Sequence, residues 1–135
     1  MNRRDFMLIV GAVSLVAPMA RAAGAAYTPE LLEAELTAGK TVFLDFKASW
    51  CSTCKAQGRA IEALKAENPE YTARISFIDV DWDQWKDDMI VADLNIPRRS
   101  TLVVLRGDAE LGRIVAGTAK AEIKALMDTA LAASV

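Results

Sequence analysis

Two cysteines separated by two residues stand where an apolar, strand-like run gives way to a helical pattern. Cys51 and Cys54 follow the apolar run 42–46 and precede a helical pattern that extends to about Glu67. A thiol at the start of a helix lies near unpaired backbone N–H groups and the positive end of the helix dipole, both of which favour the thiolate. Because the thiolate is the form that attacks disulfides, this junction predicts redox chemistry. A loop of two residues constrains an unfolded chain little, so a purely structural disulfide is the less favoured interpretation.

Composition narrows the remaining classes of function. The chain has 135 residues, 53% of them hydrophobic, which predicts one domain with an ordinary core. Its formal net charge is −2, so we expect no binding to nucleic acid. It contains no histidine, which excludes Cys-His and Ser-His nucleophile pairs and histidine metal ligands within the chain. We expect a monomer without a bound cofactor.

The N-terminal segment 1–26 has the parts of a secretory signal peptide. A positively charged start is followed by an apolar run from Phe6 to Ala20, and small residues at Ala20 and Ala22 predict cleavage between positions 22 and 23. The segment Arg3–Met7 is similar to the bacterial twin-arginine signal, so the twin-arginine route and the general secretory route both stay open. Either route predicts a periplasmic protein, a compartment in which disulfides persist.

The segment Trp50–Lys55, with the sequence Trp-Cys-Ser-Thr-Cys-Lys, resembles the active-site motif of the thioredoxin superfamily. The apolar run before it resembles the family's central strand, and Asp45 stands six residues before Cys51, where thioredoxins carry a buried acid. The resemblance covers roughly residues 28–131. It implies that Cys51 is an exposed nucleophile, that Cys54 is a shielded resolving thiol, and that Asp45 relays protons to Cys54. A desolvated carboxyl group suits that role because its pKa is raised.

The same resemblance implies a fold for residues 27–135, an α/β three-layer sandwich. Its mixed sheet would have four strands in the order 2-1-3-4, with the fourth strand antiparallel at an edge. We expect strands over 40–47, 74–80, 101–106 and 110–116. The expected helices are 29–38, capped by Thr28 and stopped by Gly39, then 51–67, 84–94 and 119–132. The first strand of full-length thioredoxin is predicted to be missing.

One departure from the family concerns the residue that packs against the cysteines. Thioredoxins carry a cis-proline there, followed by a threonine and a strand, but the gapless match places Ser100 at that position and Pro97 three residues earlier. Since a cis bond is costly before any other residue, we expect a trans peptide at Ser100, with its hydroxyl available to the thiolate. The candidate substrate-binding residues are Trp50, Arg99, Ser100 and Thr101. Arg98 and Arg99 stand either beside the thiol or in a solvated basic loop.

These features predict a periplasmic thiol–disulfide oxidoreductase, with the reductase direction favoured. Cys51, Cys54 and Asp45 are the candidate catalytic residues, and the expected partners are cysteine-containing periplasmic proteins and a redox partner such as a membrane thiol reductase. The alternative is a module on the same fold that binds or delivers copper through the two thiolates, since soft ligands suit Cu(I). The other form of this alternative is a metal shared between two chains, because two thiolates alone do not complete a tetrahedral zinc site.

Overall fold

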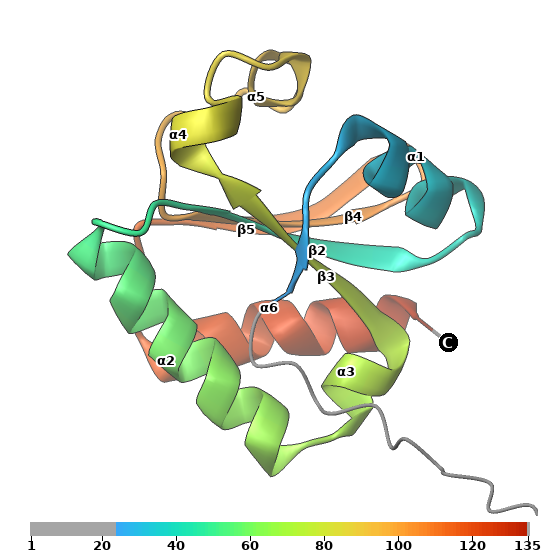
Figure 1. Ribbon diagram of the computed structural model, residues 1–135. Coiled ribbons are helices and arrows are strands. Elements are labelled where there is room, and N and C mark those ends of the chain that lie inside the picture. Colours follow the sequence, from blue (N-terminus) through green and yellow to red (C-terminus); the bar gives the residue numbers. More distant parts are fainter. Residues whose placement is uncertain (1–23, 135) are drawn as a thin grey trace, which may run out of the picture.

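The computed structural model describes residues 24–134, which form one mixed sheet between two layers of helices (Figure 1). Its strands are β1 (Ala25–Ala26), β2 (Thr41–Lys47), β3 (Ile75–Asp81), β4 (Thr101–Arg106) and β5 (Ala109–Val115). Its helices are α1 (Pro29–Thr37), α2 (Ser52–Glu67), α3 (Glu70–Arg74), α4 (Trp82–Trp85), α5 (Met89–Asp93) and α6 (Lys120–Ala133). Among these described residues, no helix has the length and apolar character needed to cross a membrane.

Strand β2 is the centre of the sheet and leads directly into the cysteine segment. It pairs in parallel with β3 and antiparallel with β4, within the order β1-β3-β2-β4-β5. All but the last of its residues are buried, because helices cover both faces of the sheet. Since side chains alternate along a strand, Phe43 and Asp45 face one layer of helices, and Leu44 and Phe46 face the other.

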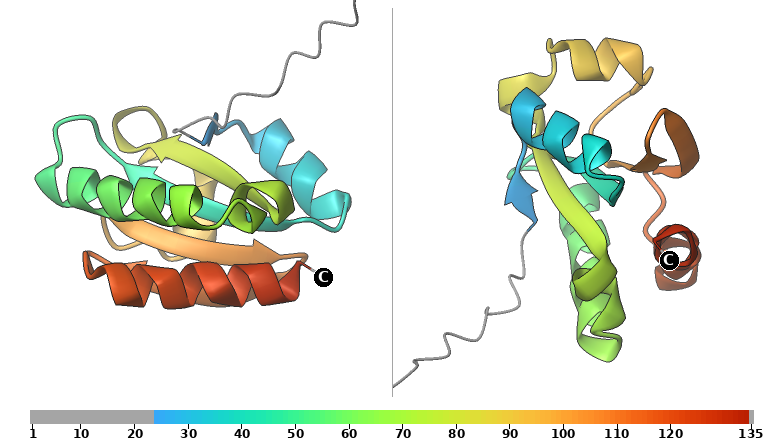
Figure 2. Two further views of the ribbon diagram at one scale, coloured as in Figure 1. Left: turned by 90° about the horizontal axis from the view of Figure 1, so that it is seen from below. Right: turned by 90° about the vertical axis from the view of Figure 1, so that its right-hand side faces the viewer.

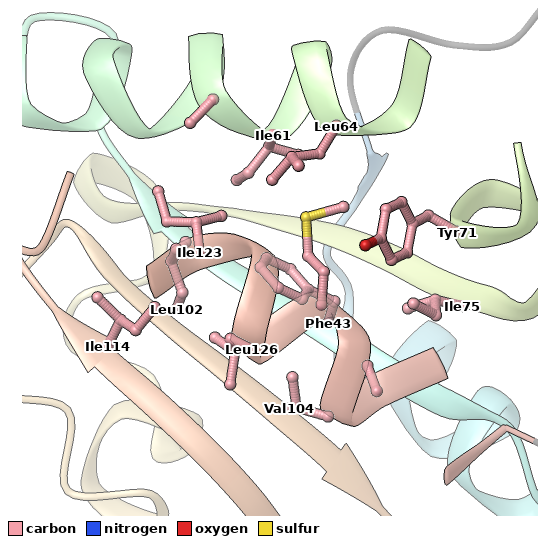
Figure 3. Close-up of a cluster of buried hydrophobic side chains, with 13 residues drawn as sticks. Phe43, Ile61, Leu64, Tyr71, Ile75, Leu102, Val104, Ile114, Ile123 and Leu126 are labelled. Carbon is pink, nitrogen blue, oxygen red and sulfur yellow. The ribbon is translucent and has the colours of Figure 1, made fainter. Parts of the chain in front are cut away.

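The two helical layers bury separate hydrophobic clusters. Helices α2, α3 and α6 cover one face of the sheet, and α1, α4 and α5 cover the other (Figure 2). In the first cluster, side chains such as Ile61 of α2 and Ile123 of α6 point toward Phe43 of β2 (Figure 3). This cluster anchors the C-terminal half of α2 against the sheet through Ala60, Ile61 and Leu64.

The sheet confirms the predicted fold and corrects its strand count. The four predicted strands correspond to β2, β3, β4 and β5, in the predicted order and with the fourth strand antiparallel at an edge. The prediction that the first strand is missing was wrong, because Ala25 and Ala26 pair in parallel with Ile78 and Asp79 of β3. Two small residues show no strand periodicity, so only the pairing reveals β1. The predicted leader otherwise lies outside the described residues.

The predicted helix over 84–94 is replaced by the two short helices α4 and α5. Asp81 caps α4 by accepting a hydrogen bond from the Asp83 N–H (3.1 Å), and Asp88 caps α5 by accepting one from the Ile90 N–H (3.2 Å). Two capping aspartates seven residues apart start two helices in place of one. The predicted cap of α1 is confirmed, since Thr28 Oγ1 accepts a hydrogen bond from the Leu31 N–H (3.0 Å).

Candidate active site

Cys51 is the N-cap residue of α2, and its sulfur occupies the position of a capping side chain. Cys51 Sγ accepts a hydrogen bond from the backbone N–H of Cys54 at 3.1 Å. A capping atom in this place satisfies one of the free N–H groups at the helix start, and a negative charge strengthens the bond. The sequence of β2 and α2 therefore places Cys51 where its ionised form is stabilised. Both cysteines are free thiols in the structure.

Both thiols are buried, which corrects the expectation that Cys51 is exposed. Cys51 is 3% exposed and Cys54 is 2% exposed, and they pack with Ala48 and the half-buried Trp82. The loop that carries Ser100 also covers them, because the Ser100 hydroxyl contacts both sulfur atoms. A partner must therefore reach Cys51 through a small opening or after a local movement of this loop.

The two thiols have opposite pKa shifts. Burial alone would raise the pKa of Cys51, but hydrogen bonds from Cys54, Ser100 and Arg99 outweigh burial and lower that pKa to about 6. The pKa of Cys54 is raised, first by burial and then by its hydrogen bond to Cys51. Near neutral pH the pair therefore holds one thiolate, on Cys51, and one thiol, on Cys54.

Ser100 replaces the proline of the family with a different backbone. None of the peptide bonds in the described part of the chain is cis, as expected for Ser100, and its φ is +65°. Its N–H donates to the Phe46 carbonyl (2.7 Å), and its hydroxyl lies 3.2 Å from Cys51 Sγ and 3.1 Å from Cys54 Sγ. Pro97 is exposed and does not take the place of the proline.

Gln57 is a part of this region that sequence reasoning missed. The side chain is fully buried on α2, and its Nε2 donates to the carbonyls of Ser100 (2.9 Å) and Gly117 (3.0 Å). A glutamine one turn after Cys54 gives no signal in the sequence, because glutamine is common on the solvent face of helices. Its burial only becomes visible when the loops before β4 and after β5 are placed.

Trp50 and Arg99 form the rim beside the cysteines. Trp50 is 56% exposed, and its indole Nε1–H donates to the Asp83 carboxylate at 2.9 and 3.1 Å from its two oxygens. The Arg99 guanidinium carbon lies 4.4 Å from the centre of the Trp50 ring, a cation–π contact. Arg99 is thus beside the thiol, not in the solvated loop of the alternative interpretation. Asp83 is a further part of the rim that the sequence does not reveal, because its role depends on this contact with Trp50.

The side chains of Thr101 and Arg98 form hydrogen bonds within the loop before β4. Thr101 is fully buried, and its hydroxyl donates to the Arg98 carbonyl at 2.7 Å. The Arg98 Nε–H donates to the Arg99 carbonyl at 3.0 Å. Both contacts stiffen the turn that presents Arg99 and Ser100. The Thr101 side chain is therefore committed to the loop, and its backbone belongs to β4.

Asp45 is a buried acid on the face of β2 that is covered by α2. It is 5% exposed, and burial, followed by the charge of Asp79, raises its pKa to about 7 against the opposing effect of Lys47. It lines a cavity of about 20 Å³, room for about one water molecule, together with Lys65 and Phe77. The Lys65 ammonium lies 4.1 Å from the centre of the Phe77 ring, beside the same cavity.

Metal-ligating side chains are not clustered in the described part of the chain. No group of three or more cysteine, histidine, aspartate or glutamate side chains is arranged there to hold a metal ion.

An open hollow of about 670 Å³ lies between α1, α5 and the turn after β4, with Tyr27, Leu36 and Ile90 among its lining residues. The cysteines do not line this hollow, so it is separate from the thiol site.

Comparisons with known proteins agree with this geometry. A sequence profile described as Thioredoxin matches residues 23–129. Thioredoxin of Echinococcus granulosus is 29% identical over 98 residues, which are 73% of this chain and 85% of that protein. Thioredoxin H2-1 of Oryza sativa subsp. japonica is 32% identical over 100 residues, 74% of this chain and 67% of that protein.

Solved structures show the same fold. The crystal structure of Trxlp from Edwardsiella tarda EIB202 matches with a TM-score of 0.65 at 24% identity, over 78% of this chain and 96% of that one. The buried dithiol at the start of α2 lies within the profile match, and both its residues fit the motif of the family. The chain therefore belongs to the thioredoxin family and is a thiol–disulfide oxidoreductase.

Proposed function

We propose that this protein reduces disulfides of partner proteins outside the cytoplasm, with Cys51 as nucleophile, Cys54 as resolving thiol and Asp45 as base. The observation that carries the proposal is the asymmetry of the pair. Cys51 Sγ receives hydrogen bonds that lower its pKa to about 6, while the pKa of Cys54 is raised. A two-step exchange needs an ionised thiol for the first attack and a second thiol that stays protonated until the mixed disulfide has formed.

The exchange proceeds through a mixed disulfide. The Cys51 thiolate attacks one sulfur of the partner disulfide, forms an S–S bond to it, and expels the other partner sulfur as a thiolate that takes up a proton. Cys54 then loses its proton and attacks Cys51 Sγ, and the second partner sulfur leaves as a thiolate. The products are the Cys51–Cys54 disulfide and a partner with two thiols, so two electrons pass to the partner.

Asp45 is suited to accept the Cys54 proton. Its pKa of about 7 means that it exchanges a proton near neutral pH, unlike an ordinary aspartate. Its Oδ1 has no hydrogen-bond partner among the described atoms, and it lines the small cavity beside α2. A single water molecule would fit in that cavity and hydrogen-bond to the Asp45 carboxylate, because a buried water needs polar partners.

The rim residues are proposed to hold the partner beside Cys51. Trp50 offers an exposed ring, and Arg99, stacked on it, offers a cation with a buried Nε that has no partner within the described chain. Ser100 and Thr101 are fully buried beneath this surface, and their loop positions Arg99. This surface suits a partner segment that carries an acidic residue next to its cysteine, because the Arg99 charge attracts it.

The reductase direction is supported by the size of the thiol pKa. A lower nucleophile pKa stabilises the reduced pair and therefore makes the protein a stronger oxidant. A strongly oxidising member of the superfamily has a nucleophile pKa near 3.5, whereas that of thioredoxin itself is about 7. The value of about 6 for Cys51 lies nearer the reducing end. The oxidised pair would then need electrons from a donor outside the chain, for which a membrane thiol reductase is the proposed partner.

Export is supported by the basic and apolar composition of the first 22 residues and by the twin-arginine-like segment Arg3–Met7. The proposal is tested by expressing the whole chain in a bacterial host, separating the periplasm, and sequencing the N-terminus. We expect a periplasmic chain that begins at Ala23. A full-length chain in the cytoplasm would contradict the proposed location without touching the proposed chemistry.

The assignment of the two thiols is tested by trapping. Cys54→Ser leaves the Cys51 nucleophile without its resolving thiol, so mixed disulfides should accumulate with a disulfide-bonded test protein such as insulin. The matched variant Cys51→Ser should trap little, because the raised pKa of Cys54 keeps the remaining thiol protonated near neutral pH. Equal trapping by both variants, or trapping by Cys51→Ser alone, would overturn the assignment.

A further inference from the structure

A glutamine at a fully buried position of α2 requires an explanation. Gln57 is 0% exposed and follows Cys54 by three residues, so it projects from the same side of the helix as that thiol. Burying an amide is unfavourable unless it is hydrogen-bonded, and an apolar side chain would fill the same space without that requirement. The partners of the amide therefore indicate what it contributes.

The Gln57 amide joins α2 to two loops that are far apart in the sequence. Its Nε2 donates to the Ser100 carbonyl at 2.9 Å and to the Gly117 carbonyl at 3.0 Å. The Ser100 carbonyl also accepts a hydrogen bond from the Ala116 N–H at 2.8 Å, so both lone pairs of this oxygen are used. The loop before β4 is thus fixed from the helix and from the end of β5 at once.

Ser100 needs such support, because its backbone is unusual. Its φ is +65°, a region that residues with a side chain rarely adopt and that persists where the surroundings hold it. The Ser100 N–H is held by the Phe46 carbonyl, and the Ser100 carbonyl by Gln57 and Ala116. With both ends of the residue fixed, the hydroxyl points between Cys51 and Cys54.

We propose that Gln57 is a positioning residue for thiol exchange, which holds the Ser100 loop so that the Ser100 hydroxyl stays within hydrogen-bond distance of both sulfurs. This inference rests on the exchange chemistry proposed above for Cys51 and deepens it. Gln57 touches neither sulfur, and it acts on them only through Ser100.

The effect of the arrangement follows from counting protons. Ser100 has one hydroxyl proton and lies between a thiolate and a thiol, at 3.2 Å from Cys51 Sγ and 3.1 Å from Cys54 Sγ. The hydroxyl donates that proton toward the Cys51 thiolate, while the Cys54 thiol donates its own proton toward Cys51 Sγ. A loop released from Gln57 would move the hydroxyl away and leave the thiolate with fewer donors, which favours protonation of Cys51.

The test compares four chains: wild type, Gln57→Met, Ser100→Ala and the double variant. Methionine keeps the length of glutamine and removes both N–H donors. The pH dependence of iodoacetamide alkylation is measured for Cys51 of the reduced protein by peptide mass spectrometry. If the Cys51 pKa rises from about 6 to about 7, the thiolate fraction at pH 6 falls about fivefold. We expect this fall in Gln57→Met and in Ser100→Ala, and no further fall in the double variant.

Ile61→Val is the matched control, since it loosens the core contacts of the same helix one turn further on without touching Ser100. It should leave the alkylation profile unchanged. If Gln57→Met does not fold, Gln57→Asn withdraws the amide by one methylene group and should shift the profile in the same direction. A profile unmoved by loss of the amide, or moved equally in the Ser100→Ala background, would overturn the proposal.

This titration does not depend on any partner. If Cys54→Ser fails to trap a partner disulfide, the proposed function fails while the alkylation profile still reports on Gln57. If trapping succeeds and the double variant shows two independent shifts, the positioning role fails while the proposed function stands.

Discussion

At the scale of single residues, the site depends on a few buried polar groups, of which Asp45 is the most consequential. In the folded protein Asp45 keeps its proton up to about pH 7, whereas an aspartate of the unfolded chain loses its proton near pH 3.9. Between these values the folded state binds the extra proton, so the free energy of unfolding falls as pH rises through this window. The fall amounts to about 4 kcal/mol.

Asp45→Asn should remove this pH dependence. We expect the variant to unfold at a higher urea concentration than wild type at pH 8 and to differ much less at pH 4, because only the ionised form is penalised by burial. The measurement is the urea midpoint of both chains from pH 4 to 8, with Asp108→Asn as an exposed control. Parallel curves for wild type and Asp45→Asn would show that Asp45 is not the group that titrates.

Ser100 illustrates why the family residue does not fit this backbone. Its φ of +65° and its N–H bond to Phe46 are both incompatible with proline, which fixes φ near −65° and has no N–H. We expect Ser100→Pro to lower the free energy of unfolding by about 3 kcal/mol or more. The measurement is equilibrium urea unfolding of the reduced protein.

Ser100→Gly is the matched comparison, because glycine accepts positive φ and keeps the N–H while losing the hydroxyl. Its stability should remain close to that of wild type, and the pKa of Cys51 should rise. A proline variant as stable as the glycine variant would contradict the backbone argument.

The sequence identifies the residues with chemical signatures and misses those with geometric roles. Cys51, Cys54 and Asp45 stand out because a Cys-x-x-Cys pair and an acid inside an apolar strand are rare patterns. Gln57 and Asp83 do not, because their importance arises from contacts with Ser100 and Trp50, 43 and 33 residues away in the chain.

At the scale of elements, long periodic segments were predicted well and short ones were not. Strand β2 and helix α2 have apolar patterns and clear ends, such as the Asn68-Pro69 stop. Helices α4 and α5 are short and depend on capping, and β1 depends on pairing with β3. Such elements are stabilised by contacts outside their own sequence, which periodicity does not record.

Asp88 is a capping residue whose loss should destabilise both α5 and the segment after β1. Its carboxylate accepts hydrogen bonds from the Ile90 N–H at the start of α5 and from the Tyr27 hydroxyl (3.2 Å) just after β1. We expect Asp88→Ala to lower the free energy of unfolding by about 1–2 kcal/mol. Burial and then Asp88 raise the pKa of Tyr27, so the variant should also ionise this tyrosine at a lower pH.

The two readouts are urea unfolding and the ultraviolet absorbance of tyrosine between pH 9 and 12. Asp87→Ala is the control, since Asp87 is exposed and adjacent. A destabilisation as large in Asp87→Ala would assign the effect to the net charge of the segment and not to the cap.

At the scale of the whole molecule, the sheet brings together parts of the site that are distant in the sequence. The cysteines follow β2, the Ser100 loop precedes β4, and the Gly117 loop follows β5, and these strands are neighbours in the sheet. The order of the strands came from the family resemblance, because periodicity alone does not decide which strands pair. The burial of Cys51 was not foreseen, since it results from the Ser100 loop, which lies over the helix start.

The reduction potential of the Cys51–Cys54 pair tests the central claim most directly, because it joins the thiol pKa values to the direction of electron flow. The protein is equilibrated in glutathione buffers of defined potential, and its free thiols are trapped and counted. The account predicts a value near that of thioredoxin, about −270 mV, as expected of a reductase. A value near −120 mV would make the protein an oxidant, and a pair that does not cycle would contradict the exchange chemistry itself.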